Sequence, residues 1–254
     1  MRKIYFQLLI LCIFFVFAAS AVADTITIVA DPWSPYNGIP DTTEPGYGIE
    51  IARRVFEAVG HTVDYKIVPW SRAIMATREG IYNAIIGANI EDAPDFIFPE
   101  EEFGVSKRDF WARKGSLWRY KGRESLLKVR IGAIKDYSYG EELNNFFKTN
   151  KERVQYAFGD KALEINIRKI LAGRIDIAVE NENVFLQKVK QMGVSEQFVS
   201  VGSIGAVDNL YIAFSPENEK SKEYAEIFTK GIRALKASGE LEKILAKYGL
   251  RYWK

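Results

Sequence analysis

A seven-residue motif has two similar copies in the chain, 93 positions apart: residues 80–86 read GIYNAII and residues 173–179 read GRIDIAV. Each copy ends an amphipathic stretch with helical spacing and opens an apolar stretch of strand length. The repeat therefore predicts an α/β protein made of two similar halves. Ligands of α/β sheets bind outside the carboxyl ends of the strands, so two halves in one chain favour a binding cleft between them.

The first 23 residues have the pattern of a secretory signal peptide. Arg2 and Lys3 form a basic start, residues 4–19 are mostly apolar, and residues 21–23 supply an Ala-x-Ala cleavage site. A retained membrane helix is the alternative, but the apolar run is short for a membrane span. We therefore expect a soluble periplasmic protein whose mature chain begins at Asp24.

The composition of the mature chain excludes several kinds of site. The one cysteine, Cys12, lies inside the signal peptide, so disulfides, a thiol nucleophile and cysteine metal sites are excluded. With one histidine, His61, a transition-metal site is not expected either. Without Arg2 and Lys3 the 35 basic residues fall to 33, which equals the 33 acidic ones and favours neither nucleic acid nor an anionic membrane. No nucleotide-binding fingerprint is present, and we expect no cofactor and no metal.

The mature chain reads as two successive βαβαβ patterns followed by a strand and two helices. Strands are predicted at residues 25–30, 63–68, 84–88, 129–134, 154–157, 175–179 and 209–214. Helices are predicted at residues 49–60, 70–79, 139–150, 162–172, 219–237 and 239–247. Residues 105–118 look extended and form a plausible first crossing between the lobes. We expect a discontinuous lobe one at 24–112 and 208–254, and lobe two at 113–207.

Six motifs follow one another in order: DPWSPY at 31–36, GYGIEI at 46–51, a tryptophan at 70, GIYNAII at 80–86, GRID at 173–176 and SGELEKI at 238–244. In this order and spacing they resemble the bacterial extracellular solute-binding proteins of family 3, the periplasmic receptors that hand polar amino acids and similar solutes to ABC importers. The resemblance covers nearly all of residues 24–249. It implies a two-lobed α/β fold of the type II periplasmic-binding class, with two sheets flanked by helices and joined by two crossing hinge strands.

The resemblance also implies ligand contacts in lobe one. Trp33 and Tyr36 lie in a proline-broken loop, and Trp70 starts a helix; their flat rings would flank the ligand, and a cation over such a ring gains ~0.5–2 kcal/mol. Ordinary core packing is the alternative for all three. Asp31 either recognises a ligand cation or caps its own loop. Arg72 either holds a ligand carboxylate or is a solvated surface residue.

Two positions depart from the family pattern. Residues 87–95 read GANIEDAPD and lack the arginine that binds an α-carboxylate in the family, although Asn89 offers polar contacts. Asn181 stands where family members usually have an aspartate for the α-amino group, and an amide holds an ammonium less strongly than a carboxylate does. Glu180 or Glu182 is a candidate to compensate, and a solvated side chain without a ligand role is the alternative for either. Either the ligand carboxylate finds another partner, or the ligand is not an ordinary α-amino acid.

The loop at 135–140 carries the expected contacts of lobe two. It joins a predicted strand to a predicted helix, and the unpaired amides at a helix N-terminus suit an anion. Ser138 and Tyr139 are the first candidates, followed by Tyr137. Ser138 acting only as the helix N-cap is the alternative.

Together these features predict a monomeric, non-enzymatic periplasmic receptor. It would capture a small polar, amino-acid-like solute by hinge closure and deliver it to an ABC permease in the inner membrane. One alternative is a cyclic-acid dehydratase on the same fold, which needs a buried carboxylate with a raised pKa, such as Glu180 or Glu182. The other is a ligand sensor for a membrane partner.

Overall fold

The computed structural model of the chain describes residues 23–253. The predicted signal peptide at residues 1–23, with Cys12 inside it, lies outside the described residues except for Ala23. Within the described part of the chain, none of the helices combines the length and the apolarity that a membrane crossing requires.

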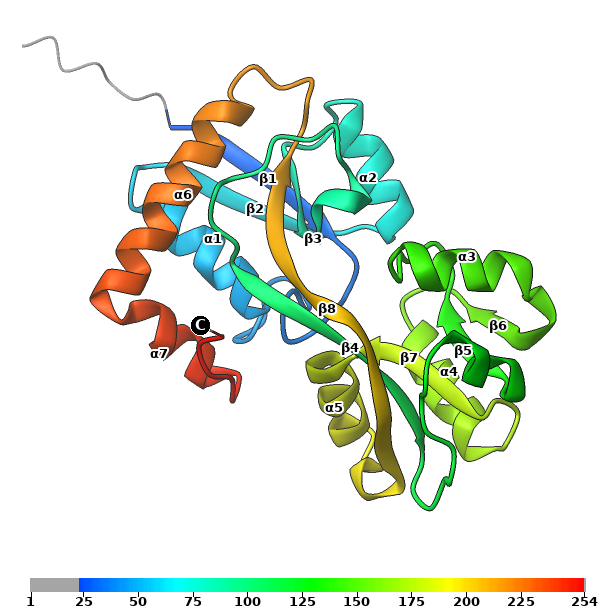
Figure 1. Ribbon diagram of the computed structural model, residues 1–254. Coiled ribbons are helices and arrows are strands. Elements are labelled where there is room, and N and C mark those ends of the chain that lie inside the picture. The colour runs from blue at the N-terminus through cyan, green and yellow to red at the C-terminus, as the bar shows by residue number, and fades with distance from the viewer. Residues whose placement is uncertain (1–22, 254) are drawn as a thin grey trace, which may run out of the picture.

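Two α/β lobes lie side by side and are bridged by the long strands β4 (Gly104–Arg113) and β8 (Phe198–Phe214) (Figure 1). Lobe one contains β1 (Thr25–Ala30), α1 (Tyr47–Glu57), β2 (Thr62–Ile67), α2 (Trp70–Arg78), β3 (Ala84–Ala88), α6 (Ser221–Ser238) and α7 (Glu240–Lys247). Lobe two contains β5 (Ile131–Ile134), α3 (Glu141–Thr149), β6 (Val154–Ala157), α4 (Ala162–Leu171), β7 (Ile177–Asn181) and α5 (Glu182–Gln191). Short 3-10 helices lie at Ile90–Asp92, Arg123–Lys128, Lys151–Arg153 and Ser195–Gln197.

The strands of residues 23–253 form one eight-stranded sheet in the order β2-β1-β3-β8-β4-β7-β5-β6. β1 lies parallel between β2 and β3, and β5 lies parallel between β6 and β7. β8 pairs antiparallel with β3 at one end and with β4 along most of its length. The predicted two-lobed α/β class is confirmed. The strands of the two lobes join into one sheet through β8, which is hydrogen-bonded to β3 in lobe one and to β4 along the crossing.

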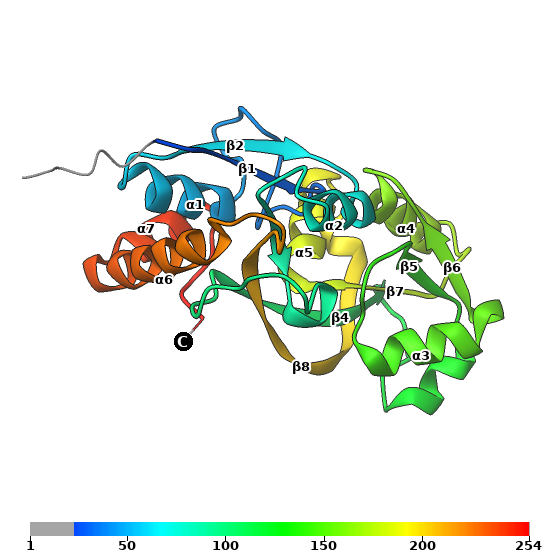
Figure 2. The same ribbon diagram turned by 90° about the horizontal axis from the view of Figure 1, so that it is seen from above.

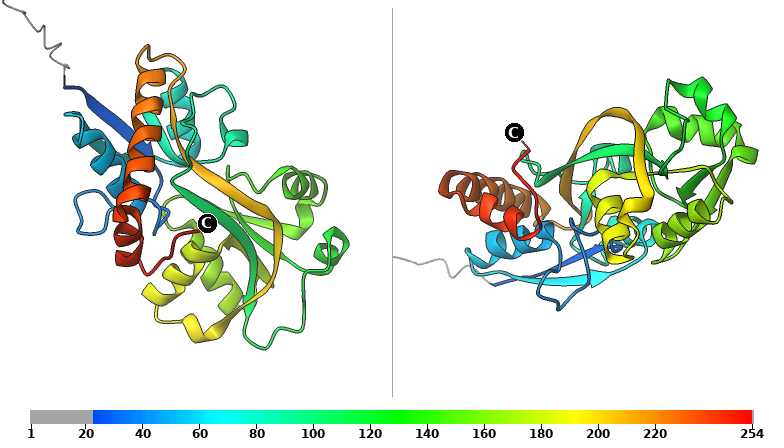
Figure 3. Two further views of the ribbon diagram at one scale, coloured as in Figure 1. Left: turned by 60° about the vertical axis from the view of Figure 1, so that its left-hand side comes forward. Right: turned by 90° about the horizontal axis from the view of Figure 1, so that it is seen from below.

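The chain passes between the lobes within β4 and β8, which stay adjacent in every view (Figure 3). Residues 104–106 of β4 pair with residues 208–210 of β8, whereas Arg108–Ala112 pair with β7 of lobe two. The crossing therefore falls inside the segment 105–118 that the sequence suggested. The exact lobe boundaries, after residues 112 and 207, remain predictions.

The sequence repeat has a shared structural role. In lobe one the backbone N–H of Thr27 donates to Oδ1 of Asn83 over 2.8 Å, and in lobe two the backbone N–H of Arg130 donates to Oδ2 of Asp176 over 2.7 Å. Asn83 and Asp176 are equivalent positions of the repeat, one just before β3 and the other just before β7. In both lobes this side chain ties the start of the third strand to the first.

Helices α1, α6 and α7 gather on the same side of β1 and β2 (Figure 2). Phe56 of α1 packs edge-on against Phe214 of β8 and also contacts Phe228 of α6, with ring centroids 6.2 and 6.0 Å away. The helices approach closely, since a Cβ added to Gly231 of α6 would lie 2.4 Å from Cγ1 of Val55 in α1. The C-terminal helices therefore complete the core of lobe one, as the sequence suggested.

Candidate functional site

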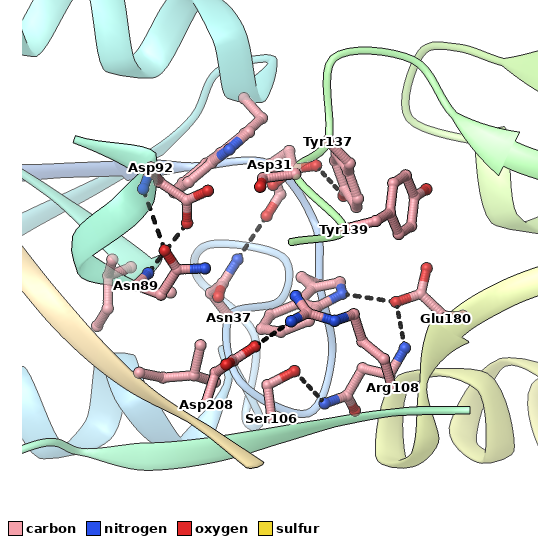
Figure 4. A pocket seen from close by; sticks show the side chains of 17 residues that line it. Asp31, Asn37, Asn89, Asp92, Ser106, Arg108, Tyr137, Tyr139, Glu180 and Asp208 are labelled. Atoms are coloured by element: carbon pink, nitrogen blue, oxygen red, sulfur yellow. Dashed lines mark hydrogen bonds and ion pairs between the residues drawn. The ribbon is translucent and has the colours of Figure 1, made fainter. Parts of the chain in front are cut away.

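A cavity lies between the lobes (Figure 4). Its walls come from the loop after β1, the end of β3, the crossing strands β4 and β8, the loop after β5 and the end of β7. It contains about 620 Å³ of empty space, open solvent included, which suits a small solute rather than a polymer. The cavity therefore occupies the carboxyl ends of the parallel strands in both lobes, where the repeat led us to expect a binding cleft.

Asp31 follows β1 and reaches across the cavity to the other lobe. Its Oδ2 accepts a hydrogen bond from the Tyr137 hydroxyl, and its carbonyl oxygen accepts one from Nδ2 of Asn37 over 2.5 Å. Burial raises the pKa of the Asp31 carboxyl to about 6, although the bond from Tyr137 acts in the opposite direction. Asp31 and Tyr137 thus form a direct connection between the lobes.

Glu180 forms a second connection between the lobes. Nε1 of Trp33 donates to its Oε1 over 3.2 Å, and the backbone N–H of Asn181 donates to the same atom over 2.7 Å. Its Oε2 is buried and has no hydrogen-bond partner among the described residues. The side chain is 4% exposed, and this burial raises the pKa of the Glu180 carboxyl to about 7. Glu180 is therefore a buried carboxyl that lines the cavity and has one oxygen without a hydrogen-bond partner among the described residues.

Tyr36 is fully buried and packs against Trp33, a residue that lines the cavity. Its ring stacks on Trp33, with centroids 4.4 Å apart. Its hydroxyl donates to the carbonyl oxygen of Val105 over 2.7 Å and accepts from Nδ2 of Asn181 over 3.0 Å and from Nδ2 of Asn183 over 3.2 Å. Tyr36 does not line the cavity, so its position supports the core-packing alternative, and it fixes the orientation of Trp33.

Asn181 lines the cavity, but its side chain is committed to the protein. Its Nδ2 donates to Tyr36 and to Oγ of Ser106 over 2.9 Å, and its Oδ1 accepts from the backbone N–H of Val184 over 3.1 Å as the N-cap of α5. Both ends of the amide are thus occupied. Glu180 therefore has a free acceptor for a ligand ammonium, whereas Asn181 has none.

Arg108 is the basic side chain that lines the first cavity, and it was not among the ligand contacts predicted from the sequence. Arg108 lies on β4 and forms an ion pair through Nη2 with Asp208 of β8. Asp92 also lines the cavity; burial raises its pKa to about 6, and Arg108 lowers it. Asn89 and Asp92 form a reciprocal capping pair with two 3.0 Å hydrogen bonds, so Asn89 lines the cavity and caps a short helix as well.

The loop after β5 brings Ser138 and Tyr139 to the cavity. Oγ of Ser138 accepts from Nδ2 of Asn144 over 3.2 Å, and the N-cap of α3 is Gly140, so Ser138 is not the N-cap. The Tyr139 hydroxyl accepts from the backbone N–H of Ile134 over 2.6 Å, which holds this ring in the core of lobe two. Of the two, Ser138 is the more available to a ligand.

Trp70 begins α2 and borders two adjoining cavities. The second cavity is larger, with about 1090 Å³ of empty space that includes open solvent. The residues shared by both cavities are Asp31, Trp33, Trp70, Tyr137 and Glu180. The bonds between Asp31 and Tyr137 and between Trp33 and Glu180 therefore form the partition between the two spaces.

The comparisons with known proteins concern the fold. No family model matches the sequence, and no curated protein matches it. A histidine kinase sensor domain with similarity to periplasmic binding proteins has a TM-score of 0.74 and 22% identity, over 90% of this chain and 98% of that one. A structure from a study of glutathione import via GshT and the cystine ABC importer TcyBC of Streptococcus mutans has a TM-score of 0.75 and 19% identity. The match covers 91% of this chain and 97% of that one. An ancestral arginine-binding protein bound to arginine has a TM-score of 0.72 and 19% identity, over 88% and 97%. The chain has a periplasmic-binding-protein-like fold.

Within this periplasmic-binding-protein-like fold, Arg72 lies away from the cavity. It is exposed on α2 and lines neither of the two cavities. The geometry therefore favours the solvated alternative for Arg72 and leaves Arg108 as the guanidinium that faces the cavity. The sequence offered one signal for Arg108. It lies in a run of three charged residues, Lys107 to Asp109, inside the segment predicted to cross between the lobes.

Proposed function

We propose that the protein is a periplasmic solute receptor that captures a small polar solute of amino-acid size between its lobes and delivers it to an ABC permease. The observation that carries the proposal is the interlobe cavity, to which both lobes contribute polar side chains and where Glu180 retains a free buried oxygen. Buried polar atoms without partners are costly, so a ligand that satisfies them gains binding energy. An amino-acid ABC transporter substrate-binding protein of Streptococcus pneumoniae, AbpA bound to L-arginine, shares the fold with a TM-score of 0.69 at 19% identity.

Capture would proceed by hinge closure. A ligand that touches both lobes binds the closed form more tightly than the open form and shifts the population toward it. The crossing strands β4 and β8 are the hinge in this proposal, because they alone carry the sheet from one lobe to the other within residues 23–253. The Asp31–Tyr137 and Trp33–Glu180 contacts between the lobes would re-form or exchange with ligand contacts at each cycle. A monomer suffices for this mechanism.

Trp70→Ala is expected to weaken solute binding at least tenfold without unfolding the protein. The indole lines both cavities, and its loss removes a ring that excludes water from the ligand, worth about 1.4 kcal/mol or more. Titration calorimetry with the solute that co-purifies, identified by native mass spectrometry, measures the change. Trp118→Phe is the matched control, because Trp118 packs on Phe110 in lobe two and lines neither cavity. Unchanged affinity in Trp70→Ala would exclude this cavity as the binding site.

A cyclic-acid dehydratase is the second candidate function, and Glu180 favours it. A buried carboxyl with a pKa near 7 and a free oxygen meets the requirement for a general acid or base. Glu182 does not, since its side chain is partly exposed and pairs with Lys107 at 3.4 Å. The ancestral amino acid-binding protein AncCDT-1, a precursor of cyclohexadienyl dehydratase, has a TM-score of 0.67 and 15% identity. Product formation from prephenate-like acids, lost in Glu180→Gln, would establish an enzyme; recovery of the solute unchanged supports the receptor.

A further inference from the structure

The charges around the cavity are unbalanced. Four carboxyl groups line it, from Asp31, Asp92, Glu180 and Asp208, and among the described residues that line it the one cation is Arg108. Arg108 is already paired with Asp208. Three carboxyl groups therefore face the space without a cationic partner in the lining, and a bound cation would restore the balance.

The buried polar atoms of the cavity-lining residues that have no partner among the described residues are all oxygens. Of the buried side-chain atoms without a hydrogen-bond partner among the described residues, Oδ1 of Asn37 and Oε2 of Glu180 belong to the first cavity, and Oε1 of Gln187 belongs to the second. Each is an oxygen that accepts a hydrogen bond and cannot donate one unless it is protonated. A ligand that satisfies them must donate hydrogen bonds, which the N–H groups of an ammonium or a guanidinium do while also supplying positive charge.

The aromatic lining suits the same ligand chemistry. Trp33, Trp70 and Tyr137 line both cavities, and an organic cation within about 6 Å of such a ring is attracted by its π face. These rings also cover the aliphatic part of an amine and exclude water from it. The partition between the two cavities therefore combines carboxyl groups with aromatic faces.

In the first cavity a ligand carboxylate has no comparable partner; the lysines of the linings, Lys135 and Lys188, belong to the second cavity. The one guanidinium of the lining is held by Asp208, so a carboxylate would have to displace Asp208 or approach three other carboxyl groups. Repulsion between like charges at close range disfavours a ligand carboxylate beside these three carboxyl groups. We infer that the cavity selects an organic amine or guanidinium cation and does not require the α-carboxylate of an amino acid. This inference rests on the proposed receptor function and specifies its ligand class.

Pairs of probes that differ only in a carboxylate test the inference. Titration calorimetry on the purified protein at pH 8 compares agmatine with arginine, and putrescine with ornithine. We expect agmatine to bind at least tenfold more tightly than arginine, and putrescine more tightly than ornithine. Equal or tighter binding of the amino acids, or no binding of either amine, overturns the inference. If glutamine or glutamate binds instead, and Trp70→Ala abolishes that binding, the receptor function stands and the cation selectivity falls.

Asp208→Asn tests the reason for the selectivity. Loss of the carboxylate frees the guanidinium of Arg108 for a ligand carboxylate, so the arginine-to-agmatine affinity ratio should rise at least tenfold over wild type. Asp64→Asn, which removes the exposed partner of Lys66 far from the cavity lining, should leave the ratio unchanged. A constant ratio in a folded Asp208→Asn variant contradicts the assigned role of the Arg108–Asp208 pair. The wild-type comparison decides the ligand class independently if that variant does not fold.

Discussion

Glu180→Gln is expected to weaken agmatine binding about a hundredfold while stabilising the ligand-free protein at pH 8. The carboxylate is the charged acceptor with a free buried oxygen among the residues that line the cavity, and its replacement leaves a bound cation without its counter-charge. Loss of a buried, charged hydrogen-bond partner costs about 3 kcal/mol, which corresponds to about two powers of ten in affinity. Titration calorimetry at pH 8 measures this loss.

The stability of the same variant follows from the pKa of Glu180. Burial raises this pKa from 4.5 to about 7 in the folded protein, so the folded state binds the proton more tightly than the unfolded state. Protonated Glu180 contributes its full share to the free energy of unfolding below pH 4.5, the pKa in the unfolded chain. This contribution is lost as the pH rises to about 7, the pKa in the folded protein. The glutamine keeps the neutral form at every pH, so the variant should be more stable than wild type by up to about 3 kcal/mol at pH 8, and by less than about 1 kcal/mol at pH 5.

Chemical denaturation at both pH values measures these two differences. Glu182→Gln is the matched control, because its exposed carboxylate lies outside the first cavity and should change neither affinity nor stability appreciably. A Glu180→Gln variant that binds agmatine like wild type, or that is less stable than wild type at pH 8, contradicts the role given to this carboxyl.

The affinity for a cationic ligand is expected to fall about a hundredfold between pH 8 and pH 5. A bound cation favours ionised Glu180, whereas the free cavity holds its pKa near 7, so each pH unit below 7 costs about a factor of ten. The titratable groups that act on Glu180, or on which it acts, are Asp31, Arg108, Tyr36, Tyr137 and Tyr139. Protonation of Asp31, whose pKa is about 6, would deepen the loss near pH 5.

Calorimetry in buffers with different ionisation enthalpies counts the protons released on binding. About one proton per agmatine is expected at pH 6, and the affinity of Glu180→Gln should depend much less on pH. Constant wild-type affinity from pH 5 to pH 8 would contradict a cation that binds beside Glu180.

The sequence predicted the repeated βαβαβ units well because their signals are local. Period, length and breaking glycines set the strands at 25–30, 84–88 and 154–157, and the structure has the same bounds for β1, β3 and β6. β8 was predicted only at 209–214, whereas it spans Phe198–Phe214. Its first part contains Gly202 and Gly205 and lacks strand alternation, and it is a strand because β4 supplies the hydrogen bonds. Long-range pairing of this kind leaves little local signal.

The cavity was predicted in part for the same reason. Residues at or just after strand ends, such as Asp31, Trp33 and Glu180, were placed near the cavity because their location follows from the fold class. Arg108 was missed because its partner Asp208 is 100 residues away and only the pairing of β4 with β8 brings them together. Asn181 was predicted as a ligand contact, but its amide is used by Tyr36, Ser106 and α5, and these contacts exist only in the folded chain.

The central claim is that the two lobes close on a small solute, and the distance between them tests it most directly. Residues 24–254 contain no cysteine, so in protein expressed from residue 24, Arg72→Cys in α2 and Asn145→Cys in α3 introduce unique sites for spin labels on exposed positions of opposite lobes. Pulsed electron spin resonance with and without agmatine should show a broad distance distribution that narrows and shortens on binding, and no such change when Glu180→Gln is added. An unchanged distribution with a ligand that calorimetry shows to be bound would contradict capture by closure of the lobes.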